Sequence, residues 1–148
     1  MKEKVHAVHR VREFNRFYMP AFDLLGNHYL GSEYSATEAR VLFEVYDNDG
    51  CNAAFIARAM NLDKSYLSRI IKRHEKNGYL LRMVSTTDSR SFDLHLTALG
   101  IERTEVFIEK SNQQIGDMIE SLNAVRCKEL IHALDTITDI LKECITTK

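Results

Sequence analysis

The segment 61–78, NLDKSYLSRIIKRHEKNG, separates apolar from polar residues as a helix on a protein surface does. At about 100° per residue, one face carries Leu67, Ile70, Ile71 and His74. The opposite face carries hydroxyl and basic side chains, namely Ser65, Ser68, Arg69, Lys72, Arg73 and Lys76. Asp63 can cap the start, and Gly78 stands where a left-handed residue commonly ends a helix. The pattern predicts a helix over Lys64–Asn77 with one buried and one basic face.

Two further helices are predicted before this segment. Ser35-Ala36-Thr37-Glu38 has the spacing of a capping box and starts a helix that runs to about Tyr46. Asn52 can cap a shorter helix over Ala53–Met60. Only the three residues 61–63 separate this helix from the next, which is the arrangement of a helix-turn-helix.

A β-hairpin is predicted after the basic helix. Residues 81–84 resemble a strand, residues 87–89 can turn, and Phe92, Leu94 and Leu96 alternate with polar side chains. The expected fold class is therefore mainly α with a small β-hairpin wing, in which residues 35–96 form a winged helix-turn-helix lobe.

The outer segments carry the apolar spacing of long helices. In residues 5–29 this face holds Val11, Phe14, Tyr18, Phe22, Leu25 and Tyr29, and Pro20 should kink or divide the helix. The pattern returns to helix from Thr97 onward. The last helix has the closest spacing, with Cys127, Leu130, Leu134, Ile137, Leu141 and Cys144 alternating steps of three and four.

Charge is unevenly distributed along the chain. Residues 53–90 hold eight Lys/Arg against three Asp/Glu, a balance of +5, while the remaining twelve against eighteen give -6. A basic segment in an otherwise acidic chain is typical of a nucleic-acid-binding module. A merely solvated face is the alternative, and geometry has to decide between them.

The basic helix supplies most of the candidate DNA contacts. Arg69 is the first candidate for contact with a base, since arginine can form a two-pronged hydrogen bond with guanine. Phosphate contacts are expected from Lys72, Arg73 and Lys76. Tyr66 either stacks on the nucleic acid or covers the core edge. Further candidates near the helix start are Lys64, Ser65 and Ser68.

The wing adds Arg82 and Arg90, and an arginine at a hairpin tip is well placed to enter a minor groove. Asp88 either braces Arg90 or only forms the turn.

These motifs, in order, resemble the MarR family. They are Leu67-Ser68-Arg69-Ile70-Ile71, Gly78-Tyr79-Leu80-Leu81-Arg82, Asp88-Ser89-Arg90 and Leu96-Thr97-Ala98-Leu99-Gly100. The resemblance implies a single domain over residues 1–148, with residues 1–30 and 97–148 as a helical dimerisation region. It also implies a homodimeric repressor on a pseudo-palindromic double-stranded DNA operator, released by a small-molecule effector. In the family the Arg90 position contacts DNA and the Asp88 position holds it.

Other functions find less support. A cleft for an effector could be lined by Phe17, Tyr18 and Tyr34, although aromatic residues at this spacing more often pack in the core. Redox sensing through Cys51 and metal sensing through His6, His9 and His28 stay minor alternatives; we expect Cys127 and Cys144 to be buried thiols. No cofactor, metal site or enzyme motif is expected.

The expected location is the cytoplasm. The opening residues 1–10 have no apolar core of a signal peptide, and no stretch has the length of a membrane helix. A winged-helix module that binds protein instead of DNA is the alternative function.

Overall fold

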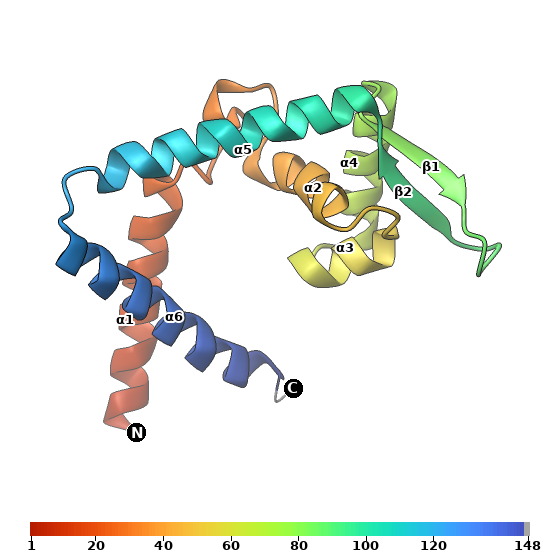
Figure 1. Cartoon of the computed structure of the whole chain (residues 1–148). Coiled ribbons are helices and arrows are strands. Elements are labelled where there is room, and N and C mark those ends of the chain that lie inside the picture. Colours follow the sequence, from red (N-terminus) through yellow and green to blue (C-terminus); the bar gives the residue numbers. More distant parts are fainter. Residues whose placement is uncertain (147–148) are drawn as a thin grey trace. The chain divides into compact units, whose positions relative to one another are not determined.

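The computed structural model describes residues 1–146, and Figure 1 shows the order of its elements. The helices are α1 (Lys2–Ala21), α2 (Ala36–Asp47), α3 (Ala53–Met60), α4 (Lys64–Lys76), α5 (Ala98–Ile119) and α6 (Ala124–Thr146). Strands β1 (Leu80–Val84) and β2 (Phe92–Leu96) form an antiparallel hairpin. The predicted fold class is confirmed. None of the helices within residues 1–146 has the length and apolarity needed to span a bilayer.

The chain divides into two compact units, Met1–Ser111 and Asn112–Lys148, and the division falls inside α5. The first unit holds α1 to α4, the hairpin and the first part of α5. The second unit holds the end of α5 together with α6, and no residue of α6 is buried. The single domain over residues 1–148 that the sequence suggests stays a prediction.

The first helix is shorter than the sequence predicts. It ends at Ala21, one residue after Pro20, which agrees with the expected division at this proline, whereas the apolar spacing predicted a helical pattern through to residue 29. Asp23 takes a left-handed conformation with φ of 56°, and the Leu24 N–H donates to the Met19 carbonyl at 2.9 Å. This hydrogen bond is typical of a Schellman helix end, with an aspartate in the place that glycine usually takes.

The predicted starts of α2, α3 and α4 are confirmed, because each has its expected cap. Ser35 and Glu38 form a reciprocal capping box. The Asn52 side chain accepts from the Phe55 N–H at 2.8 Å. The Asp63 carboxylate accepts from the N–H groups of Ser65 and Tyr66 at 3.0 and 3.1 Å. These caps satisfy donors that every helix start leaves free.

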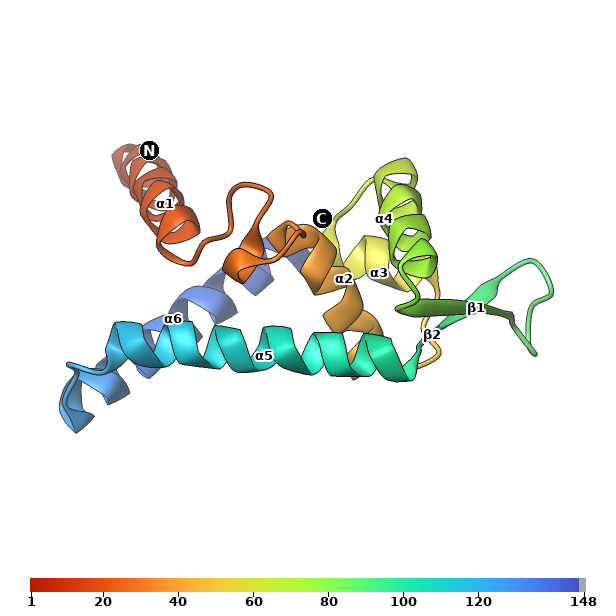
Figure 2. The ribbon, with the colours of Figure 1, turned by 90° about the horizontal axis from the view of Figure 1, so that it is seen from above.

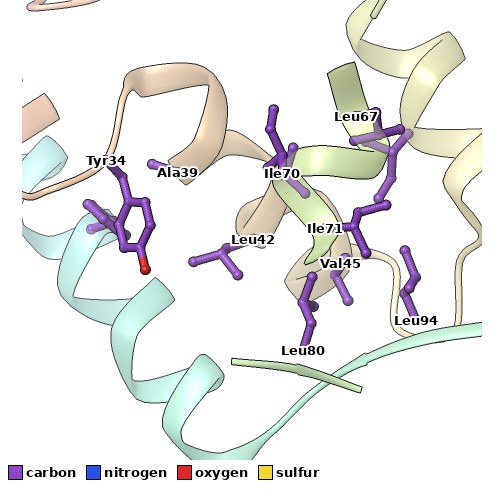
Figure 3. Packing of buried hydrophobic residues seen from close by; sticks show 12 residues of the cluster. Tyr34, Ala39, Leu42, Val45, Leu67, Ile70, Ile71, Leu80 and Leu94 are labelled. Atoms are coloured by element: carbon purple, nitrogen blue, oxygen red, sulfur yellow. The ribbon is translucent and has the colours of Figure 1, made fainter. Parts of the chain in front are cut away.

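The core of the first unit lies between α2, α4 and the hairpin, as Figure 3 shows. Its buried side chains include Leu42 and Val45 from α2, Leu67, Ile70 and Ile71 from α4, and Leu80 and Leu94 from the hairpin. Burial of one such aliphatic side chain contributes roughly 1.5–3 kcal/mol. The apolar face of α4 is thus held against its own chain, which leaves the basic face outward.

The base of the hairpin is attached to the turn between α2 and α3. The Gly50 N–H donates to the Leu94 carbonyl at 2.9 Å, and the Leu94 N–H donates to the Cys51 carbonyl at 2.8 Å. His95 Nδ1 lies 2.9 Å from the Asp49 carboxylate. Figure 2 shows the opposite end, the loop between β1 and β2, projecting away from α3 and α4.

The start of α5 is fastened to the turn that follows α4. The Thr97 hydroxyl donates to the Gly78 carbonyl at 2.6 Å and accepts from the Gly100 N–H at 2.9 Å. The Thr97 N–H donates to the Tyr79 carbonyl at 3.0 Å. A Cβ at position 100 would lie 2.1 Å from the Tyr79 carbonyl oxygen, so only glycine allows this approach.

Candidate nucleic-acid interface

The two predicted faces of α4 are confirmed. Its buried residues are Leu67, Ile70, Ile71 and His74. Its exposed residues are Lys64, Ser65, Tyr66, Arg69, Lys72, Arg73 and Lys76, while Ser68 and Glu75 are half-buried. The cap at Asp63 and these buried side chains therefore fix which side of the helix meets solvent.

Four cations of this helix remain available to a ligand. Within residues 1–146, the side chains of Lys64, Arg69, Lys72 and Lys76 have no carboxylate partner. The Arg69 guanidinium lies 5.9 Å from the centre of the Tyr66 ring, which holds the two side chains together on the exposed face. We name Lys64, Arg69, Lys72 and Lys76 the free basic set. Such a set, on a helix of a size to enter a major groove, can contact phosphates and base edges.

Arg73 has different surroundings from the other bases of the stripe. Its Nη1 is ion-paired with the Glu38 carboxylate, its Nη2 donates to the Glu33 carbonyl at 3.2 Å, and its Cζ lies 4.6 Å from the Tyr34 ring centre. Burial by itself would raise the pKa of Glu38, but hydrogen bonds from the Ser35 N–H and from Arg73 hold that pKa below its ordinary value. For Arg73 the structure favours an internal role over the predicted phosphate contact.

Arg82 is also paired within the chain. Its Nε and Nη2 lie 2.7 and 2.6 Å from the Glu75 carboxylate, and its Cζ lies 5.7 Å from the Phe92 ring centre. An ion pair this accessible contributes about 0–1 kcal/mol, so a phosphate can replace it. The DNA contact assigned to Arg82 stays a prediction.

The tip of the hairpin is ordered by its own polar side chains. The Asp88 carboxylate accepts from the Arg90 backbone N–H at 2.9 Å, and the Ser85 hydroxyl accepts from the Thr87 and Asp88 N–H groups, both at 3.3 Å. Asp88 therefore forms the turn, and its contact is with the Arg90 backbone instead of the guanidinium. Arg90 itself is exposed.

The two wing arginines border one cavity. It has a volume of about 220 Å³ and lies between the start of α3, α4 and the hairpin. Its lining residues are Asn52, Ala53, Ala54, Ile71, Arg82, Arg90, Ser91, Phe92 and Leu94. The structure thus brings Arg82 and Arg90 to the same side of the first unit, next to α4.

The candidate effector residues have different surroundings. Tyr34 is fully buried in the core, which favours its packing role. Phe17 is 70% exposed on α1. Tyr18 is half-buried and packs on its own helix, with ring centres 5.5 Å from Phe14 and 4.8 Å from Phe22. For Phe17 and Tyr18, an effector role stays a prediction.

The minor sensing alternatives gain nothing from the structure. Burial raises the pKa of the Cys51 thiol to about 11, with nearby Glu44 adding to the shift, which disfavours the reactive thiolate. Cys127 is half-buried and Cys144 is exposed, so the predicted burial of Cys144 is not found. Within residues 1–146, no three His, Cys, Asp or Glu side chains are grouped closely enough to hold a metal ion.

Some residues of this region are missed by sequence reasoning. Glu33 and Arg103 are joined by an ion pair of 2.6 Å, although they lie 70 positions apart in the chain. The Glu33 carbonyl also accepts from Arg73, and Arg103 lies over the same Tyr34 ring as Arg73. No local spacing signal links residues this distant, so only the structure shows that they belong together.

A capped helix with one buried and one basic face, followed by a hairpin that carries two arginines, defines the winged helix-turn-helix class of DNA-binding proteins. The model of the MarR family matches residues 34–92 of the chain, a segment that holds α2, α3, α4 and β1. Members of this family are DNA-binding regulators and not enzymes. The resemblance found in the sequence is thereby confirmed.

Two relatives are similar in sequence. The putative transcriptional regulatory protein for the hcr operon of Thauera aromatica is 31% identical over 58 residues, which is 39% of this chain and 35% of that protein. The HTH-type transcriptional regulator BilQ of Clostridioides difficile (strain CD3) is 25% identical over 109 residues, covering 72% of this chain and 74% of BilQ. The chain thus spans about a third of the first relative and three quarters of the second.

Solved structures share the fold. The MarR family transcription regulator SP03579 matches with a TM-score of 0.76 at 17% identity, covering 99% of this chain and 95% of that one. A mutant MarR of E. coli complexed with operator DNA matches with a TM-score of 0.69 at 18% identity, covering 91% and 95%. BpsR of Bordetella bronchiseptica, whose DNA binding is regulated by 6-hydroxynicotinic acid, matches with a TM-score of 0.67 at 18% identity, covering 90% and 98%.

Proposed function

We propose that this protein is a sequence-specific, double-stranded DNA-binding transcriptional regulator that acts in the cytoplasm as a homodimeric, ligand-responsive repressor. The single observation that carries the proposal is the free basic set on the outer face of α4. Its cations lie on a helix whose other face is locked into the core. Arg69 is assigned to a base edge, and Lys64, Lys72 and Lys76 to phosphates.

The wing supports the same proposal. Arg90 is exposed at the hairpin tip, and the turn formed by Asp88 sets the path of its backbone. An arginine carried on a projecting hairpin can reach a minor groove next to the major groove that α4 occupies. The solved complex of a mutant E. coli MarR with operator DNA supports DNA binding by a protein of the same fold.

The homodimer is supported by apolar side chains that the chain leaves uncovered. In α6 these include Leu130, Ile131, Leu134, Ile137 and Leu141. A soluble protein rarely leaves so many on one helix without a partner surface. Two copies would place their α4 helices in major grooves about one helical turn apart, which requires a pseudo-palindromic operator.

Ligand response and repression are the most specific parts of the proposal. BpsR, which shares the fold, has its DNA binding regulated by a small aromatic acid. We assign an equivalent response to this protein, with an effector that lowers affinity for the operator.

The test is selection of genomic fragments by the purified protein, followed by affinity measurements on the selected site. Arg69→Ala and Arg90→Ala should each weaken binding, by about 1–3 kcal/mol for an arginine that contacts a base. Lys110→Ala, an exposed change on α5, is the matched control. Unchanged affinity for both arginine variants would refute the assignment.

Salt dependence separates the proposal from a protein-binding winged helix. With several phosphate contacts, affinity should fall log-linearly and steeply as salt rises. Failure to retard any genomic fragment at low salt would instead favour the protein-binding module.

A further inference from the structure

Two arginines from different helices converge on the buried ring of Tyr34. Arg73 comes from α4 and its Cζ lies 4.6 Å from the ring centre, while Arg103 comes from α5 and its Cζ lies 5.8 Å from it. Tyr34 belongs to neither helix, because it stands just before α2 and is fully buried. Its ring therefore serves α4 and α5 as a shared packing surface.

Glu33 links the same two arginines through its polar atoms. Its backbone carbonyl accepts from Arg73 Nη2 at 3.2 Å, and its carboxylate accepts from Arg103 Nη2 at 2.6 Å. Glu38 completes the ion pairing of Arg73. We call Glu33, Tyr34, Arg73 and Arg103 the Tyr34 node.

The node is closely surrounded on both helices. From α4, His74 packs on Tyr34 with ring centres 5.0 Å apart, and its Nε2 lies 2.8 Å from the Glu38 carbonyl. From α5, Phe107 lies 6.5 Å from Tyr34, and the Arg103 Cζ lies 5.2 Å from the Phe107 ring centre. Arg103 Nε is buried without a hydrogen-bond partner in the described residues. Its guanidinium is thus held by Glu33 and two rings.

Arg103 is the more covered of the two arginines, whereas Arg73 stays partly open to solvent. Their side chains are 44% exposed for Arg73 and 28% for Arg103, and each is engaged with an acid and an aromatic ring. An arginine fork and a stacked plane are orientation-dependent contacts. Contacts of this kind resist rotation of α4 about its axis, which is the motion that would turn the free basic set away from DNA.

We propose that Arg73 and Arg103 are positioning residues: through Tyr34 and Glu33 they fix the orientation of α4 relative to the first turns of α5, and so set DNA affinity without touching DNA. This inference rests on the proposed function. It replaces the phosphate contact predicted for Arg73, and it gives Arg103 and Glu33 a part in binding although they lie outside α4.

The experiment measures operator affinity at several salt concentrations for the full chain and its variants. Arg73→Gln and Arg103→Gln should each weaken binding about 2- to 30-fold, the range of couplings carried by packed networks. The slope of log affinity against log salt should stay that of the wild type. Lys72→Gln, the matched phosphate contact from the free basic set, should lower the magnitude of that slope by about 0.9.

Glu33→Gln gives the sharpest contrast. It removes a negative charge near the interface, so long-range electrostatics alone would raise affinity for DNA. The positioning role requires the reverse, because Arg103 loses its carboxylate partner. Arg73→Lys extends the contrast, since lysine keeps the charge for a phosphate but not the planar fork, and it should bind as weakly as Arg73→Gln.

Several outcomes would overturn the inference. One such outcome is a salt slope that falls in Arg73→Gln as it does in Lys72→Gln. Others are wild-type affinity in Arg73→Lys and tighter binding by Glu33→Gln. Each would indicate that Arg73 contacts a phosphate, while the proposed function stands. If the wild-type chain retards no DNA, both the positioning role and the proposed function are refuted. Circular dichroism and thermal unfolding check that each variant is folded, and Glu33→Gln, which changes an exposed carboxylate, remains usable if an arginine variant unfolds.

Discussion

Helices α4 and α6 have similar apolar periodicity in sequence and opposite surroundings in the structure. In α4 the apolar face is buried against α2 and the hairpin, and only its basic face is open. In α6 none of the residues 124–146 is buried, although its leucines and isoleucines repeat every three or four positions. Periodicity thus identifies a face that needs a partner, and only the structure shows whether the same chain supplies it.

The strongest test of this contrast removes one core side chain from α4. Leu67 is 1% exposed, so Leu67→Ala should lower the free energy of unfolding by about 2–5 kcal/mol through lost burial and the cavity left behind. Chemical denaturation measures it. The loss should be the same at low and high protein concentration, and a loss below about 1 kcal/mol would contradict the packing described for α4.

The equivalent change in α6 tests the second half of the contrast. Leu134→Ala should weaken the proposed dimer by about 1–2 kcal/mol if Leu134 lies in its interface. Its effect on unfolding should therefore depend on protein concentration, unlike that of Leu67→Ala. Sedimentation equilibrium of both variants measures the association directly, and an unchanged dimer constant would exclude this face.

A third test uses pH, because α4 buries a histidine. Burial lowers the pKa of His74, so the folded state favours the neutral ring. As pH falls through the unfolded value of about 6.5, the unfolded chain takes up a proton first, and stability decreases by up to about 1.4 kcal/mol per pH unit until the folded pKa is passed.

His74→Gln should remove this part of the acid sensitivity, measured as unfolding free energy from pH 7 downward at about half-unit steps. His132→Gln, on the exposed surface of α6, is the control. A wild-type acid profile retained in His74→Gln would contradict the assignment.

The smallest expected effect compares the caps of the two helices. Asp63 caps α4, and the Asn123 side chain accepts from the Arg126 N–H at 2.9 Å at the start of α6. Alanine at either position should lower stability by about 0.5–2 kcal/mol. Only Asp63→Ala should also weaken operator binding, because only α4 carries the free basic set. Equal losses of operator affinity in the two variants would contradict this expectation.

The features that can be predicted from the sequence are those that depend on residues close together in the chain. The starts of α3 and α4 follow from Asn52 and Asp63, which act on amides two or three residues away. The end of α1 follows only in part: Pro20 indicates a break, but the final hydrogen bonds depend on Asp23 adopting a positive φ, which the apolar spacing does not indicate.

The candidate site shows the same limit. A helical wheel groups Arg73 with Lys72 and Lys76, because the wheel contains no information on residues outside the helix. The polar partners of Arg73, Glu33 and Glu38, lie 40 and 35 positions earlier in the chain. Long-range pairing of this kind is determined by the tertiary fold, and so it escapes local patterns.

The close approach of Gly100 to Tyr79 has a consequence for how the wing can vary. The Thr97 N–H donates to the Tyr79 carbonyl where the hairpin leaves and rejoins the helices, and Leu80 and Leu94 fix the base of the hairpin in the core. The part of the hairpin that can vary in length without altering the spacing of α4 and α5 is therefore the tip between Val84 and Phe92. The wing tip can therefore differ in sequence while the hydrogen bonds at the base of the hairpin are kept.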